Sequence, residues 1–408
     1  MTAPLKAIFI FLILLSSSGS FAQTRISGTV IDSNTEEPVP YAYVKKKGIN
    51  RGAITNEDGY FELDCEIGDT LVISFVSYQK KEVPYTYFLK NERYYLEPSY
   101  NELATVDIYA DFEFLYEVFS RSRKKLKKAD SYPTKTYFSM ETSTRGLPVE
   151  LLECYYNAEI DPSGIKKLEL KNGRIGMSEL DETYYANLYT TQVISDYRLL
   201  NGRDNRFPFN PLQLSKGRLK KFYDLKLVAF EDGIYKIMFN PKLKQRSCFN
   251  AIIWIDKLAE QIVKVDLQQN NLSKHPFAPI DVSHNLDSVN FNVSYTFSND
   301  KQQSLDKIEF HYELDYHREN STRRMHSNGV FLFFEKQSEF DLPYYSETGF
   351  QLSDYDKIVT QPYNEDFWKY NEVLSPSKKS IYYRNYFKKV GVLLNFDELS
   401  KFNALFQN

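Results

Sequence analysis

Residues 26–78 read ISGTVIDSNTEEPVPYAYVKKKGINRGAITNEDGYFELDCEIGDTLVISFVSY, and this stretch decides the fold of the first part of the chain. Short runs of alternating apolar and polar residues are separated by turn residues, such as Gly59 after Asn56 and Asp58. Such alternation is typical of half-buried strands, and glycine after asparagine or aspartate is typical of hairpin turns. Several short strands at this spacing predict a small β-sandwich, which we assign to residues 24–97.

Four motifs follow one another in this stretch. They are Ile26-x-Gly28-x-Val30-x-Asp32, Thr35-x-x-Pro38-Val39-Pro40-x-Ala42-x-Val44, Gly52-x-x-Thr55-Asn56-x-Asp58-Gly59-x-Phe61-x-Leu63 and Asp69-x-Leu71-x-Ile73-Ser74-x-Val76-x-Tyr78. Their ordered combination resembles the carboxypeptidase regulatory-like domain, a transthyretin-like sandwich. The sequence departs from the family pattern at Ser77, where glycine is common. The resemblance implies an accessory module without catalytic residues, of the kind that opens exported envelope proteins of Bacteroidetes-type bacteria.

Residues 1–22 have the three-part pattern of a cleaved export signal. Lys6 is followed by an apolar run over residues 7–15, and Ser20-Phe21-Ala22 fits a cleavage site of small residues. A retained membrane anchor is the alternative, but the run is shorter than the roughly 20 residues of a membrane span. We therefore expect an exported protein of the periplasm or the outer membrane, or a secreted one.

The composition favours antiparallel sheets. Of 408 residues, 16% are aromatic, and the formal net charge is −3. Aromatic residues are enriched in strands, whereas a nearly balanced charge gives no reason to expect a nucleic-acid partner. The three cysteines are an odd number, so at least one thiol is unpaired within the chain. Cys65 alternates with apolar residues and is predicted to be buried, while pairing of Cys154 with Cys248 stays open.

The rest of the chain is predicted to be mainly β. We expect a linker and an amphipathic helix in residues 98–134, an antiparallel β domain in residues 135–338, and a wrapping C-terminal segment in residues 339–408. The helix is expected at residues 111–129, because Phe112, Leu115 and Phe119 recur at helical spacing.

Two hairpins and a second resemblance complete the expected architecture. The hairpins pair residues 225–230 with 234–239 and residues 251–256 with 261–267. A short helix is expected at residues 397–405. The helix followed by a long antiparallel run resembles the half-barrel of lipoprotein-carrier proteins, in which a curved sheet wraps a helix.

The sharpest local candidates for chemistry are His311, Glu313 and His317. On one strand these side chains share a face, and imidazoles and carboxylates are metal ligands. However, strand neighbours at i and i+2 stand roughly 6–7 Å apart, which is wide for one ion. A solvated strand face opposite a buried one explains the alternation better.

No catalytic motif is recognisable in the sequence. It contains no His-x-x-Glu zinc pair, no Gly-x-Ser-x-Gly elbow and no phosphate-binding glycine loop. The basic run within residues 121–128 fits the end of a helix, where positive charge is favourable. We therefore expect a non-enzymatic binding or scaffolding protein without cofactors, whose partner is an envelope protein or a hydrophobic ligand, with peripheral attachment to the outer membrane. The alternatives are a carrier of a lipid or other hydrophobic ligand and an uncharacterised hydrolase.

Overall fold

The computed structural model describes residues 24–49, 52–75, 78–98, 112–180, 183–184, 190–200, 207–231, 233–242, 248–272, 275–277, 285–298, 303–318, 321–341, 354–360 and 363–396. The export signal predicted at residues 1–22 and the helix predicted at residues 397–405 lie outside the described residues. Contacts divide the chain into two compact units. The first comprises residues up to Pro98 together with Glu372–Ser377, and the second comprises the remainder. Within the described ranges, no helix is both long and apolar enough to span a membrane.

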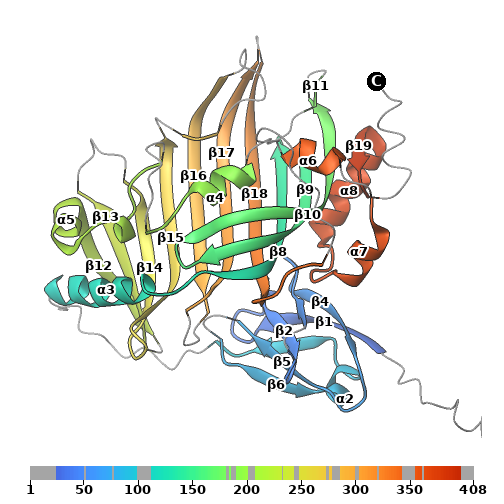
Figure 1. The fold of residues 1–408 in the computed structure, drawn as a ribbon, viewed down its shortest axis with the longest axis horizontal. Coiled ribbons are helices and arrows are strands. Elements are labelled where there is room, and N and C mark those ends of the chain that lie inside the picture. The colour runs from blue at the N-terminus through green and yellow to red at the C-terminus, as the bar shows by residue number, and fades with distance from the viewer. Residues whose placement is uncertain are drawn as a thin grey trace, which may run out of the picture. The chain divides into compact units, whose positions relative to one another are not determined.

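The first unit is a sandwich of two small sheets (Figure 1). Its elements are β1 (Thr24–Asp32), β2 (Tyr43–Lys46), β3 (Gly52–Ile54), β4 (Tyr60–Cys65), β5 (Thr70–Ser74), β6 (Lys81–Pro84), α2 (Tyr85–Phe88) and β7 (Arg93–Leu96). One sheet has the order β4-β1-β7 and the other β3-β2-β5-β6. Val30, Phe61 and Ile73 have no exposed surface and belong to one apolar core. The predicted sandwich is confirmed.

Cys65 lies in this core with no exposed surface, as predicted. Burial raises the pKa of its thiol to about 11. Cys154 and Cys248 are also buried, and the disulfide between them that the sequence left open does not form.

The turn predicted after β3 is built around Asn56. Its Oδ1 accepts hydrogen bonds from the backbone N–H groups of Asp58, at 2.9 Å, and Tyr60, at 3.0 Å. Gly59 has a φ of 71°, a left-handed conformation that favours glycine. A side chain at Gly59 would also meet the carbonyl oxygen of Val30 at 2.7 Å. The turn therefore requires both the asparagine and the glycine.

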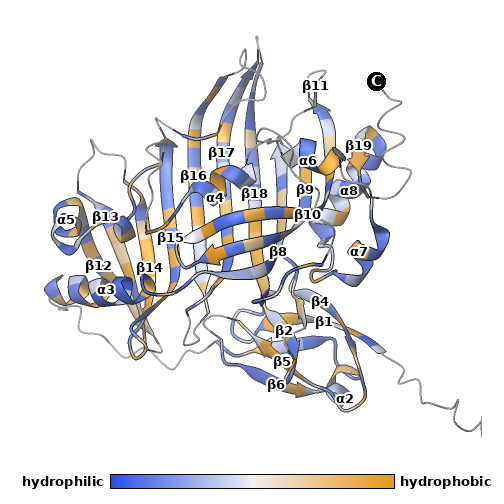
Figure 2. Cartoon of the chain, in the orientation of Figure 1, coloured by the Kyte–Doolittle hydropathy of each residue, from blue (hydrophilic) through white to orange (hydrophobic). Residues whose placement is uncertain are grey.

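The second unit contains one large antiparallel sheet. Its strands are β8 (Tyr132–Thr144), β9 (Leu147–Asp161), β10 (Gly164–Leu180), β11 (Thr183–Tyr184), β12 (Tyr223–Glu231), β13 (Ile234–Pro241), β14 (Asn250–Asp256), β15 (Gln261–Leu272), β16 (Asn285–Phe297), β17 (Leu305–Arg318), β18 (Ser321–Lys336) and β19 (Gly391–Leu394). Their order is β11-β10-β9-β8-β18-β17-β16-β15-β14-β13-β12, and β19 also pairs with β10. Hydrophobic and hydrophilic residues alternate along the strands, so the two faces of the sheet differ (Figure 2).

Short helices accompany the sheet. They are α3 (Phe112–Leu126), α4 (Thr190–Asp196), the 3-10 helix η1 (Pro211–Gln213), α5 (Lys216–Phe222), α6 (Asp354–Thr360), α7 (Glu365–Tyr370) and α8 (Lys378–Val390). We call the face that contributes to the main apolar core the inner face and the opposite one the outer face. Leu115 and Phe119 of α3 and Val193 and Ile194 of α4 join the inner-face core. Tyr383 and Phe387 of α8 instead pack with Leu151 of β9 on the outer face.

The inner face is filled by side chains of this chain. Phe277 and Tyr312 have ring centroids 4.5 Å apart, and Tyr197 and Phe207 are 4.7 Å apart. The hydroxyl of Tyr116 on α3 donates to the carbonyl oxygen of Tyr223 at 2.7 Å. Aromatic rings with satisfied hydroxyls therefore make up much of this core, which explains the aromatic surplus in the sequence.

The structure agrees with most expected elements and differs at three places. The two hairpins appear as the pairs β12–β13 and β14–β15. The amphipathic helix, expected to reach residue 129, ends at Leu126, and β8 begins at Tyr132. Residues 190–222 include three short helices within a region expected to be mostly strands. Glu372–Ser377, expected in the C-terminal wrapping segment, belongs to the first unit.

Candidate functional site

The predicted candidates His311, Glu313 and His317 lie together on the outer face of β17. Tyr312, Leu314 and Tyr316 alternate with them and are buried in the inner-face core, whereas the three candidates are half-buried. This division follows from the two-residue period of a strand. The predicted sharing of one face is confirmed.

The register of β17 with its neighbours adds further polar residues to this face. β17 ends at Arg318 and β18 begins at Ser321, so Glu313 faces His326 and Asp315 faces Arg324 across the hairpin. On the other side, Asn290 of β16 faces Glu313. We call the resulting set of side chains on β16, β17 and β18 the polar ladder.

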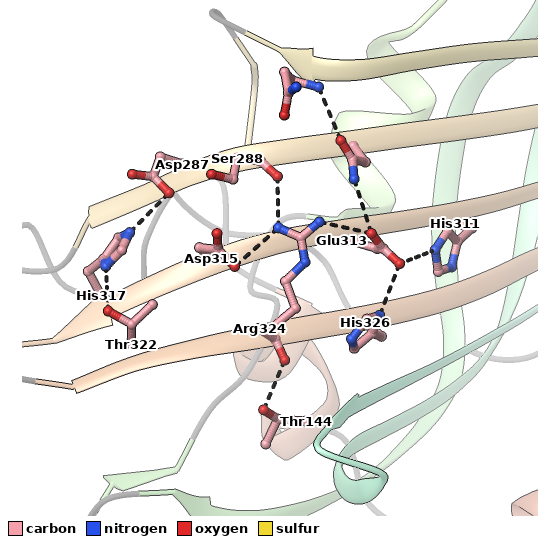
Figure 3. Close-up of polar contacts among 12 residues, drawn as sticks. Thr144, Asp287, Ser288, His311, Glu313, Asp315, His317, Thr322, Arg324 and His326 are labelled. Carbon is pink, nitrogen blue, oxygen red and sulfur yellow. Dashed lines mark hydrogen bonds and ion pairs between the residues drawn. The ribbon is translucent and has the colours of Figure 1, made fainter.

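Glu313 is the centre of the polar ladder, as Figure 3 shows. Its Oε2 accepts hydrogen bonds from Arg324 Nη2 at 2.8 Å and from Asn290 Nδ2 at 3.0 Å. Its Oε1 lies 3.2 Å from His326 Nδ1 and 3.5 Å from His311 Nε2. Both carboxylate oxygens are therefore engaged by groups from all three strands.

These contacts stabilise the charged form of Glu313. The hydrogen bond from Arg324 is the largest effect and, with that from Asn290, holds the pKa of the carboxyl at about 2. The Glu313 side chain is 28% exposed, so water still screens these charges.

Arg324 links two carboxylates. Besides Glu313, its Nη1 donates to Asp315 Oδ1 at 3.1 Å and to the carbonyl oxygen of Ser288 at 3.0 Å. One planar guanidinium thus connects the carboxylates of Glu313 and Asp315 to the backbone of β16, as Figure 3 also shows.

His317 is part of a separate group at the end of the polar ladder. Its Nε2 lies 3.0 Å from Asp287 Oδ1, and its Nδ1 lies 2.9 Å from Thr322 Oγ1. The order hydroxyl, imidazole, carboxylate is that of a nucleophile with its base and orienting acid. The hydrogen bond from His317 lowers the pKa of Asp287. However, 34% of the His317 side chain and 56% of the Asp287 side chain are exposed.

The polar ladder has no arrangement suited to a metal ion. His311 and Glu313 come together, but His317 contacts Asp287 instead of them. Across the described ranges, no group of three or more His, Cys, Asp or Glu side chains has the geometry to hold a metal. A cation at Glu313 would also have to displace the guanidinium of Arg324, because that group already occupies Oε2.

A second polar cluster lies on the outer face of β8, β9 and β10, beneath α7 and α8. Glu153 Oε2 accepts from Arg174 Nε at 2.7 Å, and both Glu153 oxygens accept from Arg384 Nη2, at 2.8 and 2.9 Å. Tyr137 donates to Glu153 Oε1 at 3.1 Å. Unlike Glu313, the Glu153 side chain is only 4% exposed.

Aromatic rings close this buried cluster. The guanidinium carbon of Arg174 lies 3.9 Å from the ring centroid of Trp368 on α7, whose Nε1 donates to Asn172 Oδ1 at 2.8 Å. Burial by itself would raise the pKa of Glu153, but the charges and hydrogen bonds of Arg174 and Arg384 outweigh it and hold the pKa at about 2. The cluster attaches α7 and α8 to the sheet.

Sequence reasoning did not assign Arg324, His326 or Asn290 to the candidate site. A signal for the first two was present, because only two residues separate β17 from β18. A two-residue connection fixes the hairpin register and so places residue 313 opposite residue 326. Asn290 carries no such signal, because a longer connection joins β16 to β17, and neither does Arg384 on the distant α8. Tyr137 and Arg174 reach Glu153 across the β8–β9 and β9–β10 hairpins, whose connections are also of two residues.

Comparison with known proteins confirms the nature of the first module. Residues 26–107 match the model of the CarboxypepD_reg-like domain. The TonB-dependent receptor SusC of Bacteroides thetaiotaomicron is 38% identical over 86 residues, which are 19% of this chain and 9% of the receptor. The match thus spans less than a tenth of this relative's length. The two matches associate the chain with proteins of the bacterial cell envelope.

Three solved structures that are similar to this chain each cover little more than half of it. A DUF1329 family protein from Desulfovibrio piger covers 57% of this chain and 95% of its own, at 11% identity and a TM-score of 0.23. A putative outer membrane lipoprotein-sorting protein domain from Vibrio parahaemolyticus covers 56% and 93%, at 12% identity and 0.24. A LolA superfamily protein from Nitrosomonas europaea covers 56% and 94%, at 10% identity and 0.21. Similarity at this level says nothing about function.

Proposed function

We propose that this protein is a non-catalytic binding or scaffolding component of the bacterial cell envelope, located in the periplasm or at the outer membrane. The observation that carries the proposal is the closed pairing of the polar ladder. Both oxygens of Glu313 are engaged by Arg324, Asn290, His326 and His311. Such a surface is a pre-ordered polar platform, because its side chains are already held by their neighbours.

Two further observations support this role. The domain at residues 26–107 is an accessory type, shared with an envelope receptor. The inner face of the sheet is occupied by the chain's own aromatic rings, such as Phe277 against Tyr312. The outer face is therefore the better surface for a partner, and we propose that the partner is an envelope protein.

Site-specific photo-crosslinking in the bacterium of origin tests this proposal. A photoreactive residue replaces Asn328, an exposed neighbour of His311 on the polar ladder, in the full chain. The matched control position is Leu258, which is 92% exposed on the β14–β15 turn. We expect a discrete adduct from position 328 in the envelope fraction and none from position 258. Equal labelling from both positions, or a chain recovered from the cytosol, would contradict the proposal.

The hydrolase alternative has one specific observation in its favour, the line of Thr322, His317 and Asp287. A catalytic triad needs a water-excluding site and donors for the developing oxyanion, and these side chains are open to solvent. We therefore expect the full protein to hydrolyse p-nitrophenyl esters no faster than its H317A variant does. A rate that His317→Ala lowers at least about 100-fold would establish the hydrolase instead.

The carrier alternative rests on the aromatic inner face. Among the described residues, α3, α4, η1 and α5 contribute side chains to the core on this face, and a hydrophobic ligand would have to displace some of them. We expect solvent extraction of detergent-free protein to yield no lipid in a stoichiometric amount by mass spectrometry. One lipid per chain would favour the carrier.

A further inference from the structure

The first unit contains an edge strand that takes an added segment from a distant part of the chain. β3 is at the edge of its sheet, whose order is β3-β2-β5-β6. The backbone N–H of Ile54 donates to the carbonyl oxygen of Val373 at 2.8 Å, and Ile54 forms a parallel bridge with Leu374. The outward N–H and C=O groups of an edge strand are a template for another strand. Glu372–Ser377 pairs with this edge at Ile54.

Asn56 supplies a second recognition group beside the edge. Because its Oδ1 accepts from the N–H groups of Asp58 and Tyr60, the orientation of its amide is fixed. The Nδ2 donates to the carbonyl oxygen of Pro376 at 3.2 Å. Asn56 is 2% exposed, and a buried amide donor needs such an acceptor. The pair Ile54 and Asn56 therefore presents two donors to the backbone of an extended segment.

The segment on the edge has the pattern of a strand-addition ligand. Its alternate residues Val373, Ser375 and Ser377 are buried, whereas Glu372 is exposed and Leu374 is half-buried. Backbone contacts supply affinity in such complexes, and alternate side chains supply specificity. The pairing is an isolated bridge rather than a ladder, so few backbone contacts would break if another segment replaced this one.

We propose that the β3 edge is a strand-addition site for an extended segment of a partner protein, which replaces Glu372–Ser377. The partner segment has an aliphatic residue, a small residue two positions later, and carbonyl groups facing Ile54 and Asn56. Glu372–Ser377 is then an internal competitor, tethered at an effective concentration on the order of millimolar. The inference goes beyond the proposed function, because it adds a second binding surface, in the first unit, and names the chemistry of the partner there.

A labelled peptide tests the inference directly. The probe is residues 371–378 of this chain, Asn-Glu-Val-Leu-Ser-Pro-Ser-Lys, carrying fluorescein. The full-length protein that receives the peptide carries V373G, L374G and S375G. These substitutions remove the buried side chains of Val373 and Ser375 and the half-buried one of Leu374, and they weaken the internal segment as a strand. We expect fluorescence anisotropy to show binding at least about 10-fold tighter than to the wild-type chain, because the tethered competitor is weakened.

Two asparagine variants in the triple-glycine background show whether the peptide binds at the β3 edge or at another surface. Asn56→Asp keeps the turn acceptor but replaces the donor with a carboxylate oxygen that repels a carbonyl. We expect Asn56→Asp to weaken the binding of the peptide at least about 10-fold. Asn91→Asp is the matched control, since Asn91 donates to Tyr87 within the same unit, away from β3. It should leave binding unchanged. Peptide binding that is absent at about 1 mM, or insensitive to N56D, would overturn the inference.

Hydrogen exchange on the wild-type chain gives a second measurement that does not depend on a variant folding. With excess unlabelled peptide, the amides of residues 372–375 and 377 should exchange faster while those of β3 remain protected. If the peptide changes the hydrogen-exchange rate in neither segment, it does not replace residues 372–377, and the inference is refuted. Failure of the proposed envelope partnership would appear separately, as a missing photo-crosslink, and would leave peptide binding unaffected.

Discussion

Glu153 and Glu313 lie on the outer face of the same sheet, and contacts with arginine hold the pKa of each carboxyl at about 2. Their surroundings differ. The Glu153 side chain is 4% exposed beneath α7 and α8, whereas the Glu313 side chain is 28% exposed on the polar ladder. A low pKa records only how strongly the charged form is preferred. The loss of folding stability when the charge is removed depends on whether its partners can then be hydrated.

The largest effect that tests this comparison is expected from Glu153→Gln. The substitution leaves Arg174 and Arg384, whose side chains are only 15% and 19% exposed, without a negative partner, and should lower the free energy of unfolding by about 3–5 kcal/mol. Glu313→Gln should lower it by less than about 1 kcal/mol, because Arg324 can be hydrated. Urea unfolding followed by tryptophan fluorescence measures both, since the two tryptophans, Trp254 and Trp368, belong to the second unit.

A triple variant sharpens this prediction. E153L, R174M and R384M together remove every charge of the buried cluster and fill it with apolar groups. Stability should return to within about 2 kcal/mol of the wild-type value, because no unpaired charge remains. The comparison fails if E153Q destabilises the protein no more than E313Q does.

The second expected effect is on acid stability. Both carboxyls have a folded pKa of about 2 against an ordinary value of 4.5. The stabilisation from each is complete above pH 4.5 and is lost as the pH falls from there toward 2, since the unfolded chain takes up the proton first. E153Q should reduce the loss of stability by up to about 1.4 kcal/mol per pH unit in this window. E313Q should reduce it by only a few tenths of a kcal/mol per pH unit, because water screens the pairs of Glu313. Urea midpoints measured at several pH values between these limits provide the test, and an unchanged slope in E313Q would contradict it.

A smaller effect is expected from Arg324→Ala. Glu313 and Asp315 both lose a partner, but both side chains are partly exposed, at 28% and 26%. The free energy of unfolding should fall by about 0.5–1 kcal/mol, and the acid dependence assigned to Glu313 should shrink with it. A loss as large as that of E153Q would mean that the polar ladder is a buried cluster in solution.

The smallest expected effect is that of salt. Raising sodium chloride to about 1 M shortens the screening length to about 3 Å, which weakens exposed pairs and leaves buried ones nearly intact. The difference in stability between wild type and E313Q should therefore shrink by a few tenths of a kcal/mol, while that between wild type and E153Q should not. Parallel urea titrations at low and high salt distinguish the two.

The sequence predicts features that depend on neighbouring residues. The alternation around Glu313 places Tyr312 and Leu314 on the opposite face, and the turn at Asn56 and Gly59 follows from local chemistry. The ordered motifs of the first module are sufficient to recognise its domain type, as the match at residues 26–107 confirms.

Long-range pairing could not be predicted in the same way. β8 pairs with β18, although most of the second unit lies between them in the sequence. Arg384 reaches Glu153 only because α8 packs against β9. Alternation specifies which face a side chain takes but not which distant segment lies beside it. The contact of Arg384 with Glu153 and the segment on the β3 edge therefore emerge only from the folded chain.

The place of Glu372–Ser377 in the first unit bears on the order of events during synthesis. Domains near the N-terminus generally begin to fold while the ribosome is still adding residues. The β3 border of this sandwich stays without its added segment until Glu372–Ser377 has been made, although the rest of the first unit ends at Pro98. Throughout that interval Ile54 and Asn56 of the nascent sandwich are accessible to any extended chain nearby. A partner that arrives then does not have to compete with Glu372–Ser377.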